Sequence, residues 1–245
     1  MSVAADTEAV STLQLVVPVH NEGDNVRALH DALVAAEVPF TSLKFVYDFD
    51  GDTTLPVIAD LQAADARLVA SKNEYGRGVL NALRWGFSHA GAGPVVVVMG
   101  DNSDRLDIIP EMVRLWRAGA TVVSPSRYMR GGEQHGGGFV KSGLSRLAGV
   151  SLKLLGFPTA DPTNNFKLYD GAWLRAQRIE SVGGFEVALE LTVKAFEQGC
   201  SIVELPTVWR DRTFGQSNFR LFKWLPHYLS WYFRAIRALL FGPKR

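Results

Sequence analysis

The stretch that most constrains the fold is the apolar run of residues 94–99, which ends in the polar sequence Gly-Asp-Asn-Ser-Asp at 100–104. Such a run, rich in β-branched residues, predicts a strand buried on both faces of a parallel sheet. Ligands bind at the carboxyl ends of these strands, and Asp101 with Asp104 would suit one hard divalent cation and a phosphate-bearing substrate. The same residues also suit an ordinary turn or helix cap. From this stretch alone, both interpretations stay open.

Composition narrows the class of protein. The chain has 245 residues, of which 47% are hydrophobic, enough for one large domain or for one domain with an appendage. A formal net charge of +1 gives no global electrostatic basis for binding nucleic acid. The single Cys200 excludes an intramolecular disulfide and fits a reducing compartment. We expect a cytoplasmic location and a flexible tail at residues 1–12, which lack the pattern of a secretory signal.

Strands and helices alternate along most of the chain, without an internal repeat or a domain linker. Strands are predicted over residues 13–19, 45–47, 67–71, 94–99, 120–125 and 201–208, and helices over 26–36, 53–61, 79–90, 108–118, 141–155 and 185–197. This alternation specifies an α/β fold with a mostly parallel sheet flanked by helices, whose polar strand ends meet at one edge. The glycine-rich residues 131–138 predict a mobile loop beside that edge.

The end of the chain has a different character. Residues 221–241 form a helical pattern crowded with aromatic residues and leucines, interrupted by four basic or titratable side chains: Lys223, His227, Arg234 and Arg237. This pattern is typical of an amphipathic helix at a membrane interface. Packing on the protein's own core, or a dimer face, explains it equally well. No run of eighteen apolar residues predicts a conventional transmembrane helix.

The residues that carry chemistry form two groups. Zinc-ligand spacing and a Gly-x-Ser-x-Gly motif are both absent from the sequence. What remains is a set of acidic strand ends, Asp48, Asp50, Asp101 and Asp104, together with cations in the second half of the chain. Carboxylate-held metal on one side and basic side chains on the other would suit a substrate that carries phosphates at both ends.

Seven short segments, spread over most of the chain, occur in an order that is characteristic of one protein family. They are Val-Val-Pro-Val-His-Asn-Glu at 16–22, the acidic cluster at 48–54, Asn73 with Gly76, Arg77 and Gly78, the loop at 99–104, Asp161-Pro162-Thr163 with Phe166, Phe185-Glu186 with Glu190, and Arg212 with Gly215 and Ser217. Over residues 13–218 this order resembles a family-two inverting glycosyltransferase of the GT-A fold. Within that family it is most similar to the dolichyl-phosphate mannose synthase group, which transfers a sugar from a nucleotide to a polyprenyl phosphate.

The resemblance implies roles for particular residues. The nucleotide-sugar would lie against Pro18, Asn21, Glu22, Asp48, Arg77, Gly78 and Asp101. Magnesium or manganese would be held by Asp101 and Asp104, which with Arg212 form the expected catalytic set. The acceptor phosphate would be held by Arg127, Lys141, Ser145, Arg212 and Ser217.

The sequence also departs from the family's pattern at five positions. Gly100 and Asn102 stand where the family commonly has Asp, so that the ligand pair shifts to Asp101 and Asp104. The other departures are Tyr47 for a frequent Asp, Lys141 for a frequent Arg, and Asn218 for a frequent Lys. These changes bear on the geometry of the metal site and on acceptor affinity, not on the fold.

The resemblance therefore predicts a metal-dependent transfer of mannose or glucose from GDP- or UDP-hexose to a dolichyl- or undecaprenyl-type phosphate. The expected domains are a tail at 1–12, a GT-A domain at 13–218 and an amphipathic helix at 219–245 that attaches peripherally to the cytoplasmic face of a membrane. Transfer to a soluble or glycan hydroxyl, and a non-catalytic nucleotide-sugar-binding protein, are the alternatives. A homo-oligomer or a membrane-protein partner stays open.

Overall fold

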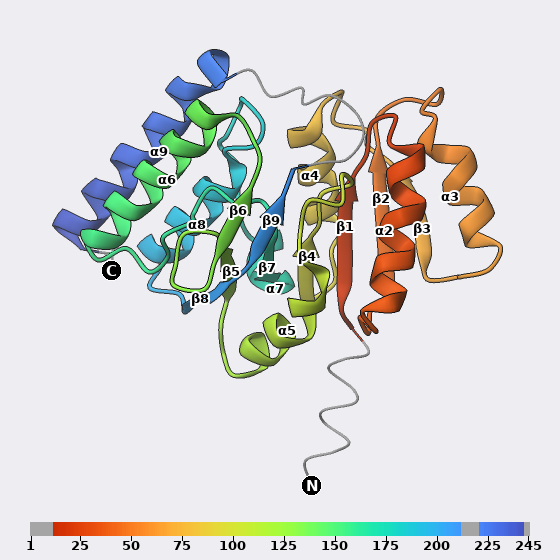
Figure 1. Cartoon of the computed structure of the whole chain (residues 1–245), viewed down its shortest axis with the longest axis horizontal. Helices are drawn as coiled ribbons and strands as arrows, with labels where there is room; N and C mark the ends of the chain where they lie inside the picture. Colours follow the sequence, from red (N-terminus) through yellow and green to blue (C-terminus); the bar gives the residue numbers. More distant parts are fainter. Residues whose placement is uncertain (1–11, 212–220, 243–245) are drawn as a thin grey trace, which may run out of the picture.

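A seven-stranded sheet runs through the centre of the molecule in the order β3-β2-β1-β4-β7-β5-β8 (Figure 1). The computed structural model describes residues 12–211 and 221–242, so the predicted tail lies almost wholly outside the described residues. The strands are β1 (Gln14–Pro18), β2 (Ser42–Tyr47), β3 (Leu68–Lys72), β4 (Pro94–Val97), β5 (Val122–Ser126), β7 (Lys167–Asp170) and β8 (Ile202–Pro206). This mostly parallel sheet confirms the predicted α/β fold class.

Strand β7 runs antiparallel to both of its neighbours, β4 and β5. The sequence analysis missed this strand, because four residues, Lys-Leu-Tyr-Asp, are too few for a periodicity to identify. Its first residue, Lys167, lies opposite Val97 at the end of β4. The insertion of β7 therefore brings residues 161–166, which precede it, to the carboxyl ends of β4 and β5.

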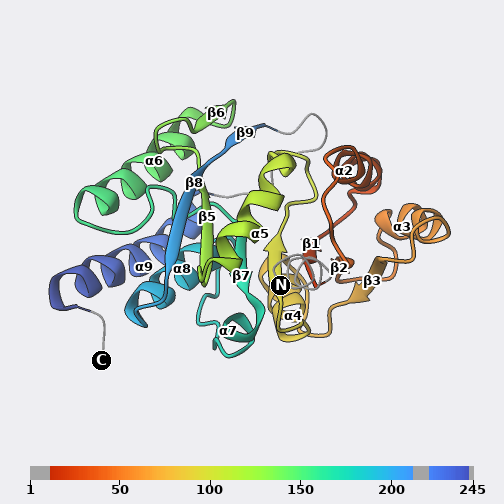
Figure 2. The same cartoon turned by 90° about the horizontal axis from the view of Figure 1, so that it is seen from below.

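Helices cover both faces of the sheet, because successive side chains of each strand point to opposite sides. In β1, Leu15 and Val17 pack in the core under α2, α3 and α5, whereas Val16 packs in a second core under α4, α7 and α8. Figure 2 shows α2 and α5 on one side of the sheet and α4 and α7 on the other. The helices are α2 (Gly23–Ala35), α3 (Thr54–Gln62), α4 (Val79–Ser88), the 3-10 turn η1 (Leu106–Ile108), α5 (Ile109–Arg117), α6 (Phe139–Leu154), α7 (Gly171–Arg175), α8 (Val187–Glu197) and α9 (Leu221–Phe241).

A second, two-stranded sheet lies beside the main one. It pairs β6 (Glu133–His135) in parallel with β9 (Val208–Arg210). The glycine-rich loop predicted at 131–138 thus contains a strand, which is held further by the amide of Gly137 donating to Asp211 Oδ2 at 3.0 Å. The single strand predicted at 201–208 is divided into β8 and β9 on either side of the buried Thr207.

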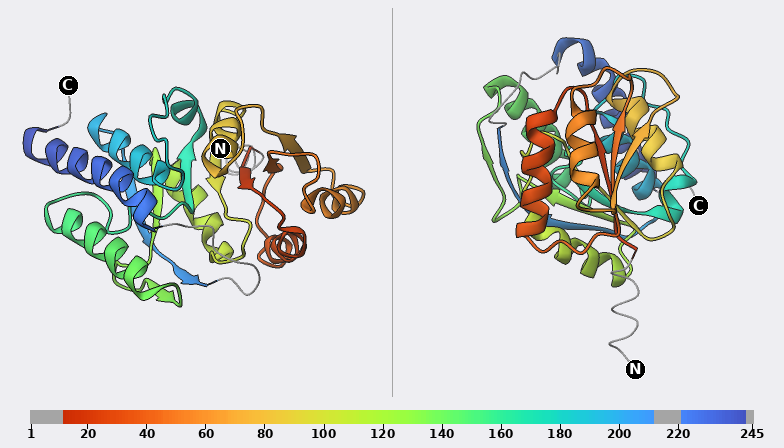
Figure 3. Two further views of the ribbon diagram at one scale, coloured as in Figure 1. Left: turned by 90° about the horizontal axis from the view of Figure 1, so that it is seen from above. Right: turned by 90° about the vertical axis from the view of Figure 1, so that its right-hand side faces the viewer.

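The C-terminal helix α9 packs on the protein's own core along one face. Its Trp231 and Ala235 are buried with Leu152 of α6 and Val193 of α8, and α6 and α9 lie side by side in Figures 1 and 3. Another face of α9 stays exposed, with Phe233 at 61%. No helix within the described ranges has the length and apolar character needed to cross a bilayer.

Candidate active site

The carboxyl ends of the parallel strands bring the predicted site residues to one edge of the sheet. Asn21 follows β1, Asp48 follows β2, Asp101 follows β4 and Arg127 follows β5. Each strand pair keeps a parallel register, except at the inserted β7, so these loops lie on the same side. Loops far apart in sequence therefore come together, as expected for a cleft at a sheet edge.

Hydrogen bonds connect the loop after β1 to the loop after β2. The amide of Asn21, a residue in the left-handed conformation at φ 57°, donates to Asp52 Oδ1 at 3.0 Å. Its side-chain oxygen accepts from the amide of Thr53 at 3.1 Å, and the amide of Glu22 donates to Thr54 Oγ1 at 2.9 Å. The buried Asp52 is an anchor that the sequence analysis did not single out, although it lies in the predicted acidic cluster.

One of the two carboxylate oxygens of Asp48 has no hydrogen-bond partner among the described residues, so it is a candidate acceptor for a ligand. Oδ2 of Asp48 accepts from the amide of Gly78 at 2.7 Å, so the candidate acceptor is the buried Oδ1. His20 Nδ1 lies 3.7 Å from Oδ1, beyond a hydrogen bond. Next to it the ring of Phe49 contacts His20 at 5.2 Å between centroids, and Arg77 lies 5.5 Å over the same ring. An acceptor beside a flat ring and a cation is a suitable setting for a nucleobase.

Two carboxylates lie close together in the loop after β4. Asp101 Oδ1 accepts from the amide and hydroxyl of Ser103, at 3.2 and 2.6 Å. Asp104 is half-buried, and its buried Oδ2 atom has no hydrogen-bond partner within the part of the chain that the structure describes. Burial and the nearby charge of Asp101 raise the pKa of Asp104 to about 7, against the opposing charge of Arg127. Such a pair, with one oxygen unpartnered, suits a cation.

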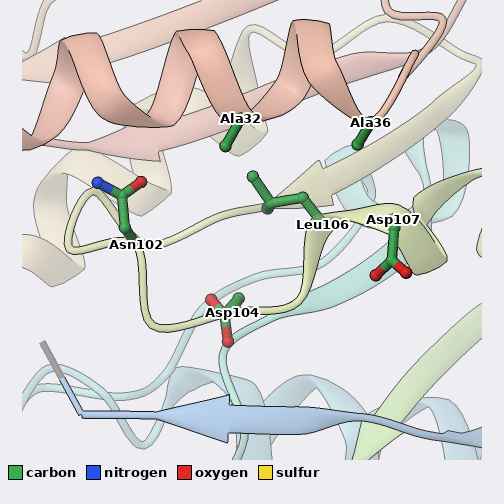
Figure 4. Close-up of a pocket in the computed structure, with 6 residues that line it drawn as sticks. All are labelled: Ala32, Ala36, Asn102, Asp104, Leu106 and Asp107. Atoms are coloured by element: carbon green, nitrogen blue, oxygen red, sulfur yellow. The ribbon is translucent and has the colours of Figure 1, made fainter.

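Asn102 stands between the two carboxylates in sequence and connects their loop to α2. Its backbone has φ 55°, and its side-chain amide donates to the carbonyl of Asn25 in the first turn of α2 at 2.9 Å. The Asn102 side chain thus fixes the loop to α2. Figure 4 shows Asn102 and Asp104 on this loop and Ala32 of α2 across a pocket of 240 Å³.

The described residues contain no group of three or more His, Cys, Asp or Glu side chains placed to hold a metal ion. Two carboxylates are nevertheless a suitable protein contribution for Mg²⁺, which often takes its other ligands from substrate phosphates and water. Asp50 does not join the pair, because it is exposed and its carboxylate pairs with Lys72 at 2.6 Å. The residues present therefore fit a divalent cation that is bound together with a diphosphate.

On the other side of the edge, Arg127 is paired with a buried carboxylate. Its Nε and Nη2 donate to Asp161 at 2.6 and 2.8 Å, and its backbone amide donates to the same carboxylate at 3.0 Å. Asp161 has no exposed surface. Burial disfavours the charged guanidinium, but the carboxylate outweighs burial and raises the pKa of Arg127 above its ordinary value. The ion pair fixes the direction of the arginine side chain.

The other predicted acceptor residues are placed only in part. Ser145 Oγ lies 2.7 Å from Thr163 Oγ1, within hydrogen-bond distance. Lys141 belongs to α6, four residues before Ser145. Arg212 and Ser217 lie outside the described residues.

Lys167 is a buried charged residue that the sequence analysis missed. Its amino group donates to the carbonyls of Asp161 at 3.0 Å and Asn164 at 2.8 Å. Burial lowers the pKa of Lys167 to about 7, aided by Arg127 and opposed by the carboxylates of Asp161, Glu204 and Asp104. A single lysine after a turn motif gives no sequence signal for such a position, because its burial depends on where β7 inserts.

Glu186 and Glu190, one helical turn apart, anchor the loop before α8. Glu186 accepts from the amides of residues 182–184, and Glu190 accepts from the amides of Glu180 and Ser181. Glu190 also pairs with Lys194 at 2.7 Å. Both carboxylates are buried, and each has several donors, so their contacts are those of structural anchors.

The fold and this edge define the class of protein: a mostly parallel α/β sheet of the GT-A type, with acidic residues following the ends of β2 and β4. The sequence matches the description "Glycosyl transferase family 2" over residues 14–171. The chain therefore belongs to glycosyl transferase family 2, as the sequence motifs indicated.

Two curated relatives give the scale of the likeness. The chain is 23% identical over 227 residues to a dolichol-phosphate mannosyltransferase of Pyrococcus furiosus, covering 88% of this chain and 62% of that protein. It is 26% identical over 212 residues to a polyprenol monophosphomannose synthase of Mycolicibacterium smegmatis, covering 83% of this chain and 79% of that one. This chain thus spans less than two thirds of the length of the archaeal relative.

Solved structures agree with the fold. Glucosyl-3-phosphoglycerate synthase from Mycobacterium tuberculosis, in complex with Mn²⁺, UDP and phosphoglyceric acid, superposes with a TM-score of 0.66 at 16% identity, covering 98% of this chain and 83% of that one. The mannosyltransferase PcManGT from Pyrobaculum calidifontis, in complex with GDP-Man and Mn²⁺, gives a TM-score of 0.65 at 16% identity, with coverages of 92% and 64%. At this identity the likeness establishes the GT-A fold.

Proposed function

We propose that this protein transfers a hexose, mannose or glucose, from a GDP- or UDP-sugar to a polyprenyl phosphate, with inversion at the anomeric carbon. One observation carries the proposal. Asp104 lies close enough to Asp101, and to the Arg127 and Asp161 ion pair, for the charges of all three groups to act on it at one edge of the sheet. A metal-bound donor diphosphate on one side and an acceptor phosphate on the other would bring the reacting atoms between them. The names of the two relatives, a dolichol-phosphate mannosyltransferase and a polyprenol monophosphomannose synthase, support mannose as the sugar and a polyprenyl phosphate as the acceptor.

On the donor side, Asp48 would accept a hydrogen bond from the base and Asp101 with Asp104 would hold Mg²⁺ or Mn²⁺. The bound cation would neutralise charge on the leaving nucleoside diphosphate. The loops that carry these residues are fixed by the bonds of Asp52 and Asn102, so the donor is positioned before reaction.

On the acceptor side, an oxygen of the polyprenyl phosphate attacks the anomeric carbon in line as the bond to the diphosphate breaks. This oxygen is anionic at neutral pH, so the attack requires no strong general base. Arg127, Lys141 and Arg212, with the hydroxyls of Ser145 and Ser217, would hold the phosphate. Catalysis then consists of positioning two substrates and stabilising charge between them.

Helices α6 and α9 would carry the protein to the lipid. Several of their apolar side chains are exposed: Val140, Leu144, Leu147, Leu154, Leu229, Phe233, Leu240 and Phe241. Residues 139–160 and 219–245 contain no Asp or Glu. An exposed apolar surface on helices whose own charged residues are all basic suits an anionic bilayer surface. The predicted docking element thus widens from α9 alone to both helices, and attachment at the cytoplasmic face stays a prediction.

Vesicle co-sedimentation tests this attachment. We expect Leu147→Glu combined with Phe233→Glu to abolish binding to vesicles of 30 mol% anionic lipid, because each substitution places a charge in the apolar surface. The matched control is Val34→Glu on α2, an equally drastic change of a side chain that is 51% exposed and distant in sequence from both helices. Equal binding of the double variant and the control would contradict the docking surface.

A donor and acceptor screen tests the reaction itself. GDP-mannose, GDP-glucose, UDP-mannose and UDP-glucose are each combined with Mn²⁺ and either a short-chain polyprenyl phosphate or 3-phosphoglycerate. The second acceptor tests transfer to a hydroxyl, the candidate favoured by the likeness to glucosyl-3-phosphoglycerate synthase. Formation of a polyprenyl-phosphate sugar supports the proposal, whereas transfer to 3-phosphoglycerate alone, or to neither acceptor, refutes it.

A further inference from the structure

The turn at residues 161–164 contacts two predicted acceptor residues that come from different elements. Asp161 at its start holds the guanidinium of Arg127, which follows β5, at 2.6 and 2.8 Å. Thr163 in its middle lies 2.7 Å from the hydroxyl of Ser145 in α6. The position of this turn therefore determines the distance and direction between the arginine and the serine that are proposed to bind the acceptor phosphate.

Lys167 holds the two ends of this turn by hydrogen bonds. The amino group of Lys167 donates to the carbonyls of Asp161 and Asn164, the first and last residues of the turn, at 3.0 and 2.8 Å. Asn164 also donates from its side chain to the carbonyl of Pro125 in β5 at 3.1 Å. Lys167 itself has no exposed surface, and β7 places it opposite Val97 at the end of β4.

Burying an amino group costs free energy unless the group is hydrogen-bonded. Packing alone does not require a lysine here, because an apolar residue of similar size would fill the same space. What the lysine adds is a pair of donors for two buried carbonyls: that of Asn164, and that of Asp161, which also accepts a longer hydrogen bond from Ser124 Oγ at 3.5 Å. Two N–H groups suffice for two carbonyls, so the contact persists whether or not the amine carries a proton.

We propose that Lys167 is a positioning residue for the acceptor phosphate: it fixes the 161–164 turn, and the turn sets Arg127 and Ser145 at the spacing that binds the phosphate. The inference rests on the proposed function, in which these two residues bind the acceptor. It does not extend to the donor, whose loops after β1, β2 and β4 form no hydrogen bond with Lys167 among the described residues.

The kinetic test compares two buried lysines. Lys167→Met keeps the volume and removes both donors, whereas Lys194→Met removes an equally buried lysine that bonds Glu190 and Glu180 and contacts neither the turn nor the acceptor residues. We expect Lys167→Met to raise the KM for a short-chain polyprenyl phosphate at least tenfold, with the donor KM and kcat changed less than threefold. Lys194→Met should leave the acceptor KM within twofold, and Lys167→Arg, which retains donors, should recover part of the loss.

Two further measurements keep the inference testable if Lys167→Met folds poorly or if the proposed reaction is wrong. Thr163→Val removes the hydroxyl that contacts Ser145 Oγ at 2.7 Å and donates to Asp161 Oδ1 at 3.4 Å, and leaves the hydrogen bonds of Lys167 in place. We expect a threefold rise in acceptor KM. Hydrogen exchange needs no turnover: peptides containing Arg127 and Ser145 should exchange at least tenfold faster in Lys167→Met than in Lys194→Met.

The outcomes are distinct. If the wild-type protein transfers sugar to no polyprenyl phosphate, the proposed function fails, while the exchange comparison still decides whether Lys167 holds Arg127 and Ser145. Equal exchange in the two lysine variants, or an equal rise of donor and acceptor KM in Lys167→Met, overturns the positioning role.

Discussion

The donor side and the acceptor side of the proposed site are held together by different interactions. On the donor side, hydrogen bonds between backbone amides and short polar side chains join the loops, as when Asp52 binds the amides of Asn21 and Thr54. On the acceptor side, buried charges do this, with Asp161 on Arg127 and Lys167 beneath the turn. A hydrogen bond between neutral groups, such as that of Glu22 with Thr54, contributes modestly, and one to a carboxylate such as Asp52 contributes more. Removal of one member of a buried ion pair costs more still, because it leaves a charge unpaired. The acceptor side should therefore be the more fragile.

The largest effect should come from the metal pair on the donor side. Asp101→Ala should lower kcat by at least about 100-fold, because stabilisation of the leaving diphosphate by a metal supplies several kcal/mol of the barrier. Steady-state assays at saturating donor and Mn²⁺ measure this. The control is Asp107→Ala in the 3-10 turn η1 that follows the loop of Asp101, an exposed carboxylate paired with Arg105. Full activity of Asp101→Ala would remove this residue from the metal site.

On the acceptor side, Arg127→Met should lower the free energy of unfolding by about 3–5 kcal/mol, because Asp161 is left buried and uncompensated. The double variant Arg127→Met with Asp161→Asn should recover much of that stability, since no buried charge then remains at the pair. Acceptor binding should stay impaired in both. Urea unfolding and titration with a polyprenyl phosphate separate the two effects; recovery of acceptor binding in the double variant would assign the pair a purely structural role.

The buried lysine gives the acceptor side a pH dependence. The pKa of Lys167 is lowered from 10.5 to about 7 in the folded protein. Between these values the unfolded chain binds the proton and the folded chain does not, so stability rises with pH, by at most about 1.4 kcal/mol per unit for one proton. Below pH 7 both states bind the proton and the contribution is constant. The stability of the wild type relative to Lys167→Met should therefore rise between pH 7 and 9; parallel curves would contradict this.

The smallest effect, a loss of stability, should come from removing a single hydrogen bond between two loops on the donor side. Thr54→Val removes the hydroxyl that accepts the amide of Glu22 at 2.9 Å, and should cost about 1–2 kcal/mol of stability. Thr207→Val is the matched control, because the Thr207 hydroxyl is buried and has no hydrogen-bond partner among the described residues. Equal stability of the two variants, measured by urea unfolding, would mean that this hydrogen bond contributes nothing.

The contrast between the two sides also marks how far the sequence predicts the structure. On the donor side, the apolar run before Asp101 and the alternation of strands and helices predicted that Asn21, Asp48 and Asp101 lie at one edge. These residues follow parallel strands, and the rules for parallel sheets need only the order of the elements. The role of Asp52 was not evident, because an Asp in a turn looks the same whether or not a distant amide binds it.

The acceptor side depends on facts that a local pattern does not contain. Periodicity reports burial, and it says nothing of the direction or the partners of a four-residue strand such as β7. Without β7 there is no reason to bury Lys167 or to bring Asp161 to Arg127. The sequence motif at Asp161 indicated family membership but not this contact. The functions of Arg212 and Ser217 stay predictions, since both lie outside the described residues.

The central claim is that donor and acceptor bind on separate sides of one cleft, and a crossed titration tests it most directly. GDP and UDP with Mn²⁺, and separately a short-chain polyprenyl phosphate, are titrated into Asp48→Asn and Ser145→Ala. We expect Asp48→Asn to weaken binding of the preferred nucleotide about tenfold, roughly the loss of one hydrogen bond to a charged group, and to leave the lipid phosphate unaffected. Ser145→Ala should show the reverse pattern. Both variants weakening both ligands equally would contradict the account.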